Sequence, residues 1–308
     1  MRVATIDIGT NTVLLLIAER RGSGVLEAVE EHATITRLGE GVDRTRRLLP
    51  AAIERTSACL DEYGRRIRDL AVDRVAVVGT SAMRDAGGGE QVVARVRELL
   101  GVDARVLSGV EEARLTFRGA LSGLPRDERH DVAVFDIGGG STEVVVGRPG
   151  GTDRITFAES FDVGSVRLTE RHITHDPPMQ EERLAITSAA RKAFASVPPV
   201  QPHLAPVGIA GTMTTLAAVS LGLVPYDGRR VHGHVMTRQE LVRVVDRLGA
   251  LALPERRAVA GMEPKRADVI VAGGLIALSL VDGWAAEAVT VSDRGVRWGL
   301  AEEIASEG

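Results

Sequence analysis

The chain has 308 residues, including 38 lysines and arginines, 42 aspartates and glutamates, and a single cysteine. The slight net negative charge gives no basic surface for nucleic acid, and one cysteine, Cys59, excludes an internal disulfide and a C-x2-C zinc module. A chain of this length is typical of two domains that each bury their own core.

The sequence predicts neither a membrane-spanning segment nor an export signal. No apolar run approaches the roughly 18 residues that a membrane helix needs. The apolar stretch at the N-terminus contains Asp7 and lacks the basic region, long apolar run and cleavage site of a signal peptide. The sequence therefore predicts a cytosolic protein that does not bind membranes.

The first half of the chain alternates strands and helices, which predicts an α/β domain. Two β-branched runs separated by Gly9-Thr10-Asn11 indicate a hairpin, and apolar residues at helical spacing after Pro50 indicate a helix. In chain order we expect strands at 2–8, 12–18 and 25–33, a helix at 51–68, a strand at 75–78, a helix at 91–100, a strand at 105–107 and a helix at 111–121.

The pattern restarts after a polar, turn-rich linker at residues 123–129. The boundary predicts a first domain of residues 1–124 and a second of residues 125–295. In the second domain we expect strands at 132–135, 142–146, 155–161 and 207–210, with mostly helical segments between and after the last two.

An internal repeat marks this restart. Asp7-Ile8-Gly9-Thr10-Asn11-Thr12 and Asp136-Ile137-Gly138-Gly139-Gly140-Ser141 share Asp-Ile-Gly and a hydroxyl at the sixth place. Each copy ends one strand and begins the next. The repeat predicts two similar domains whose loops face one another across a cleft, although Asp-Gly turns are common enough for the match to arise by chance.

The two loops are suited to binding phosphate. Glycine has no Cβ atom to keep a ligand away, and the amides of such a loop can converge on an anion. Asp7 and Asp136 cannot hold phosphate themselves, so two carboxylates at these loops make sense if Mg²⁺ lies between them and the ligand. The alternative is that residues 138–140 only close a hairpin.

Further carboxylates follow the loops. Glu111-Glu112 opens a predicted helix, where a capping role is the default interpretation. Glu143 lies just after the second loop, in a strand otherwise made of valines. One of these carboxylates could orient or deprotonate water beside a phosphoryl group.

Other candidates lie where a strand meets a helix. Arg84 follows the strand 75–78 and should emerge at the strand's carboxyl end, where open sheets bind ligands, unless it is an ordinary surface arginine. The stretches 164–167 and 211–215 place small and hydroxyl residues ahead of a helix, which suits helix capping and anion capture alike.

The remaining motifs exclude several chemistries. The histidines lack the spacing of a zinc site, Cys59 fits the core of an amphipathic helix, and neither G-x-x-x-x-G-K-[ST] nor G-x-S-x-G occurs. P-loop nucleotide binding and α/β-hydrolase chemistry are therefore not expected.

The two Asp-Ile-Gly loops together resemble the paired phosphate loops of the actin, sugar kinase and heat-shock ATPase superfamily. More specifically, the chain resembles the exopolyphosphatase and guanosine pentaphosphate phosphatase family. The matching stretches span nearly the whole chain, in one order, at 7–12, 80–84, 108–115, 136–143, 164–170, 211–217, 232–234 and 292–295.

The resemblance implies two ribonuclease-H-like domains flanking a cleft, with a last helix at about 296–308 that packs back on the first domain. It implies an Mg²⁺-dependent exopolyphosphatase, with Mn²⁺ as a substitute metal, and suggests a homodimer. A guanosine pentaphosphate 5′-phosphohydrolase is the alternative. A phosphotransferase of the same superfamily and a non-catalytic nucleotide-binding switch also stay open.

The resemblance also assigns residues. Asp7, Asp136 and Glu143 would hold the metal, and Glu112, or else Glu143, would activate water. Some family members carry a basic residue or histidine where Leu14 stands here. Phosphate would be bound by Gly9, Thr10, Asn11, Thr12, Arg84, Gly138, Gly139, Gly140, Ser141, Thr142, Gly211 and Thr212.

Overall fold

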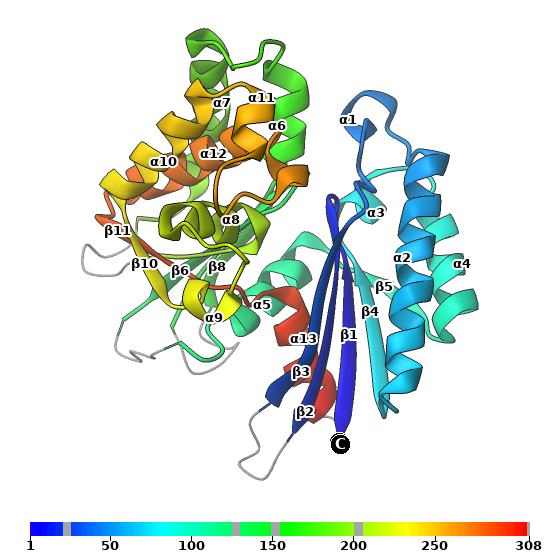
Figure 1. Cartoon of the computed structure of the whole chain (residues 1–308). Coiled ribbons are helices and arrows are strands. Elements are labelled where there is room, and N and C mark those ends of the chain that lie inside the picture. The colour runs from blue at the N-terminus through cyan, green and yellow to red at the C-terminus, as the bar shows by residue number, and fades with distance from the viewer. Residues whose placement is uncertain (21–25, 125–129, 149–154, 200–205, 307–308) are drawn as a thin grey trace. The chain divides into compact units, whose positions relative to one another are not determined.

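The structure, a computed structural model, describes residues 1–20, 26–124, 130–148, 155–199 and 206–306 (Figure 1). It divides into two compact units, one formed by Met1–Gly119 with the C-terminal helix, the other by Ala120–Gly295. The chain thus passes from the first unit to the second after Gly119. The predicted linker follows this point, and its residues 125–129 lie outside the described part of the chain.

The first unit is built on a five-stranded sheet of order β3-β2-β1-β4-β5. The first three strands form an antiparallel meander, and β4 and β5 run parallel to β1. Its elements are β1 (Arg2–Ile8), β2 (Thr12–Arg20), β3 (Leu26–Ile35), α1 (Val42–Thr45), α2 (Pro50–Asp69), β4 (Arg74–Gly79), α3 (Ser81–Asp85), α4 (Gly89–Leu100), β5 (Ala104–Val106), α5 (Gly109–Ala120) and α13 (Val296–Ser306).

Helices cover both faces of this sheet. Because successive side chains of a strand point to opposite faces, Ile6 of β1 packs in the cluster that contains Leu60 of α2. Val3 packs in a different cluster, with Trp298 of α13. Figure 1 shows α2 and α4 along one side of the sheet and α13 along the other. The last helix therefore completes the core of the first unit.

The second unit contains a six-stranded sheet of order β10-β11-β9-β6-β7-β8. Its elements are β6 (Val132–Ile137), β7 (Thr142–Gly147), β8 (Ile155–Phe161), α6 (Ser165–His172), α7 (Gln180–Ala193), η2 (Phe194–Ser196), β9 (Val207–Ile209), α8 (Ala210–Leu221), α9 (Gly228–Val231), β10 (His234–Thr237), α10 (Arg238–Ala250), α11 (Leu253–Arg257), η3 (Pro264–Arg266), α12 (Ile270–Gly283) and β11 (Ala288–Val291).

Apart from β10, this sheet repeats the first one. β6 and β7 are antiparallel, as are β7 and β8, while β9 and β11 continue in parallel beside β6. The same order and directions occur in β1 to β5. The internal repeat and the α/β class predicted from the sequence are thus both confirmed.

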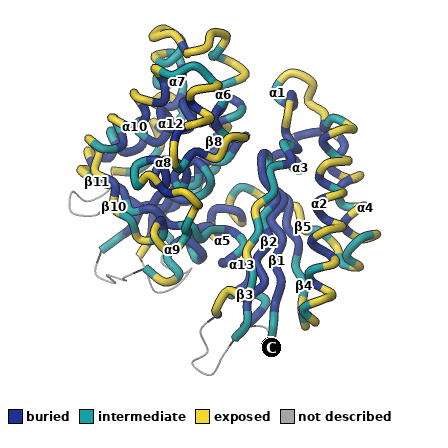
Figure 2. Tube along the Cα trace, viewed as in Figure 1, coloured by how far each residue is buried: buried dark blue, intermediate teal, exposed yellow. Residues whose placement is uncertain are grey.

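The core of the second unit centres on α12, which is apolar around its whole circumference apart from Ser279 and, near its end, Asp282. A helix of this kind must be buried, and most of its residues are buried, as the dark blue of α12 in Figure 2 indicates. Phe135 of β6 packs in the same cluster as Ile276 of α12, and its ring centre lies 5.8 Å from that of Trp284. No helix of the described ranges has the length and apolar character needed to cross a membrane.

Some boundaries differ from the sequence predictions. Strand β6 continues to Ile137, two residues beyond the predicted end, and the predicted strand at 207–210 stops at Ile209 because Ala210 begins α8. The helix α3, of five residues, was not predicted because it is too short to show a helical period. Of the predicted strand 25–33, residue 25 lies outside the described ranges.

Candidate active site

The predicted site residues fall into two sets, one in each unit. Asp7, the first loop, Arg84 and Glu112 belong to the first unit. Asp136, the second loop, Glu143 and the start of α8 belong to the second.

In the first loop, hydrogen bonds fix which way each peptide group points. The Gly9 amide donates to the Thr12 carbonyl at 3.0 Å, closing the turn. The Thr10 and Asn11 carbonyls accept bonds from the amides of Gly39, at 2.8 Å, and Thr36, at 3.1 Å. In a trans peptide the C=O and the following N–H point in opposite directions. The amides of Asn11 and Thr12 therefore point away from the segment that binds these carbonyls.

In the second loop the carbonyls are likewise held by hydrogen bonds, which here come from α6. The Gly138 amide closes the turn on the Ser141 carbonyl at 3.0 Å. The Gly138 and Gly139 carbonyls accept backbone bonds from the start of α6 at 2.9 and 3.0 Å, and the Gly140 carbonyl accepts Nε of Arg167 at 2.6 Å. The amides of three successive residues, 139 to 141, therefore point away from α6, which is the arrangement of an anion-binding nest.

Gly164 allows α6 to come this close to the loop. An ideal Cβ at this position would lie 2.6 Å from the carbonyl carbon of Gly140 and even closer to the Gly139 backbone. Any side chain would therefore push α6 away from the loop. Gly164 lies just ahead of α6, and its lack of a side chain lets α6 pack against the loop.

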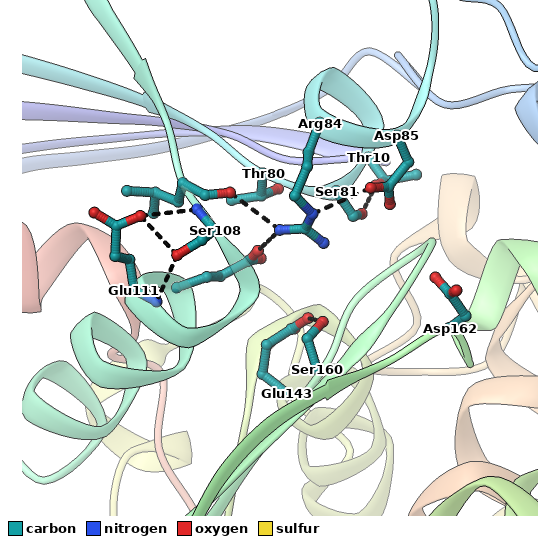
Figure 3. A network of polar contacts seen from close by, with 12 residues as sticks. Thr10, Thr80, Ser81, Arg84, Asp85, Ser108, Glu111, Glu143, Ser160 and Asp162 are labelled. Carbon is teal, nitrogen blue, oxygen red and sulfur yellow. Dashed lines mark hydrogen bonds and ion pairs between the residues drawn. The ribbon is translucent and has the colours of Figure 1, made fainter.

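Arg84 and Glu112 form an ion pair in the first unit. Figure 3 labels Arg84 together with its other partner, Asp85. Nη1 of Arg84 lies 2.9 Å from Oε2 of Glu112, and its Nε lies 3.1 Å from Oδ1 of Asp85. The Leu107 carbonyl also accepts Nη1 at 3.2 Å. Glu112 is buried and Arg84 half-buried, so neither is an ordinary surface residue. The guanidinium holds the Glu112 carboxylate in one orientation.

Glu111 and Glu112 have separate roles. Oε2 of Glu111 accepts the Ser108 amide at 2.9 Å and the Ser108 hydroxyl at 2.7 Å, which caps the start of α5 (Figure 3). These bonds from Ser108 hold the pKa of the Glu111 carboxyl below its ordinary value. The capping interpretation is therefore right for Glu111, whereas Glu112 turns inward to Arg84.

In the second unit, Asp136 and Glu143 share one face of the sheet. They are directly opposite in the antiparallel pair β6–β7, and Glu143 is in turn opposite Ser160 of β8. Glu143 is buried, and its Oε1 accepts the Ser160 hydroxyl at 2.6 Å. Directly opposite like charges destabilise a sheet, so this pair of carboxylates suits a site that takes up a cation.

The start of α8 adjoins the second loop. The Thr212 hydroxyl donates to the Ile137 carbonyl at 3.1 Å. Ala210 adopts a left-handed backbone with φ of 62°, a strained conformation for a residue with a side chain and one that concentrates at functional sites. Gly211 and Thr212, predicted to lie ahead of the helix, are in its first turn.

Arg266 was missed by the sequence predictions. Its guanidinium lies directly over Gly211, in the space that a Cβ at that position would fill. Burial lowers the pKa of this guanidinium, while the charges of Glu263 and Asp136 oppose that shift. An isolated arginine within Pro-Lys-Arg carries no motif, so only the fold could bring it to the start of α8.

Other predicted phosphate-binding hydroxyls differ in their surroundings. The Thr10 hydroxyl lies 2.7 Å from that of Ser81, at the tip of the first loop. Thr142 is fully buried and its hydroxyl donates to the Val163 carbonyl at 2.5 Å. In this structure the Thr142 hydroxyl thus ties the hairpin to the segment before α6.

The described residues contain no group of three or more His, Cys, Asp and Glu side chains arranged to hold a metal on their own. Cys59 is buried in α2, as the sequence predicted. Mg²⁺ usually binds one or two carboxylates together with substrate phosphates and water rather than an all-protein cage. The opposed pair Asp136 and Glu143 fits that mode of binding.

Comparison with known proteins matches residues 16–307 to the model of the Ppx/GppA phosphatase family. The chain is 37% identical to Exopolyphosphatase 2 of Mycobacterium tuberculosis over 99% of this chain and 98% of that one. It is 26% identical to guanosine-5′-triphosphate,3′-diphosphate pyrophosphatase of Vibrio atlanticus, over 99% of this chain but only 59% of that protein.

Solved structures agree in fold. The Ppx/GppA family member of Aquifex aeolicus superposes with a TM-score of 0.83 at 35% identity, covering 100% of this chain and 99% of that one. An exopolyphosphatase-like protein superposes with a TM-score of 0.91 at 30% identity, with the same coverage. The predicted fold of two α/β domains of the actin-like type is therefore confirmed.

Proposed function

Because the chain belongs to the Ppx/GppA phosphatase family, we propose that it is an exopolyphosphatase that hydrolyses the terminal phosphoanhydride of inorganic polyphosphate and releases orthophosphate. The observation that carries this proposal is the 37% identity to Exopolyphosphatase 2 over nearly the full length of both chains. The buried carboxylates and the two loops support the same reaction class.

We assign the activation of water to Glu112. Its carboxylate is buried and oriented by Arg84 at 2.9 Å, and an oriented carboxylate can take a proton from water as it attacks phosphorus. Arg84 adds a positive charge at the same place, which favours an anionic chain. Glu143, buried and bound by Ser160, is the second candidate for this role.

The loops would carry the negative charge of the phosphoryl group. Their amides, turned away from the carbonyl partners described above, can donate to phosphate oxygens in the ground state and the transition state. In the second unit the Arg266 guanidinium over Gly211 supplies a cation at the start of α8, where the Thr212 hydroxyl bonds to the Ile137 carbonyl just before the loop. We therefore add Arg266 to the predicted phosphate-binding residues.

Asp7, Asp136 and Glu143 would hold Mg²⁺, with Mn²⁺ as a substitute. The opposed register of Asp136 and Glu143 supports this assignment, because a cation would relieve the repulsion between them. When bound, the metal would neutralise part of the phosphate charge. The predicted result is a loss of orthophosphate release when divalent cations are chelated.

A guanosine pentaphosphate 5′-phosphohydrolase is the second candidate function. The identity of 26% to a guanosine-5′-triphosphate,3′-diphosphate pyrophosphatase over 99% of this chain favours it. Both substrates end in a phosphoanhydride, so the same carboxylates and amides would act on either. A phosphotransferase would instead need an acceptor, and a switch would bind without turnover.

One assay separates these candidates. Orthophosphate release is measured from inorganic polyphosphate and from guanosine pentaphosphate, each with and without Mg²⁺ and ADP. We expect Mg²⁺-dependent release from polyphosphate without ADP. Faster release from guanosine pentaphosphate would favour the second function, consumption of polyphosphate only with ADP a phosphotransferase, and no turnover of either substrate would contradict a hydrolase.

The proposal includes a cytosolic location, a homodimer, and no nucleic-acid or membrane partner. The slight net negative charge supports the absence of a nucleic-acid partner. Sedimentation equilibrium of the purified chain tests the dimer, which a mass of 32.8 kDa in solution would contradict.

A further inference from the structure

Arg256 of α11 is a buried charge that no predicted motif contains. Only 2% of this residue is exposed. Removing a charge from water is costly unless the group is paired and hydrogen-bonded. The surroundings of Arg256 must therefore supply several acceptors, and the identity of those acceptors shows what the residue holds in place.

The guanidinium joins three separate parts of the second unit. Its Nε donates to the Leu248 carbonyl at 2.9 Å and its Nη2 to the Leu251 carbonyl at 2.8 Å, at the end of α10. Nη1 donates to the Ala267 carbonyl at 2.8 Å. Nη2 also lies 3.2 Å from Oδ1 of Asp176.

One of these parts, the segment at Ala267, is adjacent in sequence to a residue of the candidate site. Ala267 is fully buried and follows Arg266, whose guanidinium lies over Gly211. The backbone on either side is a tight corner, because the Arg266 amide donates to the Glu263 carbonyl at 2.8 Å and the Val269 amide to the Arg266 carbonyl at 3.0 Å. The bond from Arg256 anchors this corner to α10.

We propose that Arg256 is a positioning residue for substrate binding, which fixes the corner at Ala267 so that Arg266 presents its guanidinium at the start of α8. This inference rests on the proposed function, in which Arg266 binds the anionic chain. A rigidly held cation loses less conformational freedom on binding phosphate than a mobile one. Loosening the corner should therefore weaken substrate binding more than the chemical step.

A double-mutant cycle tests this proposal. KM and kcat for polyphosphate are measured for Arg256→Lys in the wild-type chain and in the Arg266→Gln variant. We expect Arg256→Lys alone to raise KM about fivefold with kcat within about twofold of wild type, and to raise KM no further once Arg266 is gone. An equal increase in both backgrounds would overturn the proposal, because Arg256 would then not act through Arg266.

Two further variants separate positioning from general loss of stability. Ile186→Val, in the core of α7 and fully buried, should lower Tm without changing KM. If Arg256→Lys does not fold, Asp176→Asn replaces it, since the Asp176 side chain is 45% exposed. We expect a KM increase of about twofold, absent when Arg266 is glutamine, and an unchanged KM would overturn the proposal.

The outcomes also distinguish a failure of the positioning role of Arg256 from a failure of the proposed function. No orthophosphate release by the wild-type chain would contradict the proposed function. An unchanged KM in Arg266→Gln would contradict the binding role of Arg266 and with it the role of Arg256. A raised KM in Arg266→Gln, combined with an independent effect of Arg256→Lys, would contradict only the positioning role.

Discussion

The two units use the same hairpin but surround its aspartate with different side chains. In the first unit Asp7 is opposite Leu14, and Leu14 is opposite Ala33. In the second unit Asp136 is opposite Glu143, which is opposite Ser160 and accepts its hydroxyl. The repeated fold has thus kept one aspartate in each unit, while the neighbouring strand carries a second carboxylate in only one of them.

The first unit obtains its second carboxylate from a helix instead. Glu112 of α5 is held by Arg84 of α3, and both helices follow strands of the parallel half of the sheet. A carboxylate on the central hairpin is fixed by strand register, whereas one on a helix can be oriented by a separate cation. The hairpin is therefore the scaffold that both units share, and the second carboxylate comes from a strand in one unit and from a helix in the other.

The largest expected effect concerns the helix that completes the first unit. Trp298 of α13 is fully buried among Val3, Leu16 and Ala301. Trp298→Ala should lower the free energy of unfolding by about 3–5 kcal/mol, because it leaves a large cavity. Urea unfolding followed by circular dichroism measures the loss. A change below about 1 kcal/mol would show that α13 is not part of this core.

The next prediction concerns the carboxylate supplied by the helix. Glu112→Gln keeps the size of the side chain but cannot accept a proton, so kcat for polyphosphate should fall by about 10²-fold or more. The Tm should change little. Steady-state phosphate release measures kcat, and Glu111→Gln, one residue away at the cap, is the matched control. Equal turnover of both variants would remove Glu112 as the water-activating group.

Substitution of Glu143, the carboxylate of the second hairpin, should lower kcat by a comparable factor but for a different reason. Glu143→Gln removes one of two opposed negative charges, so we expect a kcat loss of about 10²-fold together with a higher Mg²⁺ requirement. Titration of activity with Mg²⁺ separates the two effects. Leu14→Gln, at the equivalent place in the first unit, should leave the Mg²⁺ requirement unchanged. Near-normal turnover of Glu143→Gln would contradict its role.

A smaller effect is expected from the residue that orients Glu143. Ser160→Ala removes the hydroxyl bond of 2.6 Å to Glu143. Losing one hydrogen bond to a charged group costs about 1.5–3 kcal/mol at most, and water can replace part of it, so kcat should fall about tenfold or less. Steady-state assays of Ser160→Ala and Ser160→Thr measure the effect, and Thr should restore most of the activity.

The smallest effect concerns the cap of α5. The side-chain and backbone bonds from Ser108 lower the pKa of the Glu111 carboxyl in the folded chain. Ionised Glu111 therefore stabilises the folded chain at pH values above the ordinary glutamate pKa. That stabilisation is lost as the pH falls through the lowered pKa. Glu111→Ala should lower Tm by a few degrees at neutral pH. Thermal unfolding from pH 7 to pH 3 should show the two chains converging, and a constant difference would contradict this account.

Local patterns predicted much of the fold. The hairpin 2–8 and 12–18 and the helix 51–68 were found because β-branched runs, a Gly-Thr-Asn turn and helical spacing are local signals. The strand order and the extra edge strand β10 depend on pairing between distant segments. The sequence therefore predicted the elements and the repeat but not how the strands are arranged.

The candidate site was most visible in the sequence where a motif recurs or where a strand meets a helix. The two Asp-Ile-Gly loops are visible as a repeat, whereas adjacent Glu111 and Glu112 look alike until packing turns one to Arg84. Arg256 and Arg266 carry no local pattern in a chain whose positive charge is nearly all arginine. Their roles follow from contacts with Ala267 and Gly211 that only the folded chain creates.

The most direct test of the account is to follow the oxygen of the attacking water. Polyphosphate is hydrolysed in ¹⁸O-labelled water, and the released orthophosphate is examined by mass spectrometry. Attack of water on the terminal phosphorus, with Glu112 taking its proton, predicts one solvent oxygen in each released orthophosphate of the wild-type chain and almost no labelled product from Glu112→Gln. Orthophosphate without solvent oxygen, or equal labelling rates for the two chains, would contradict the account.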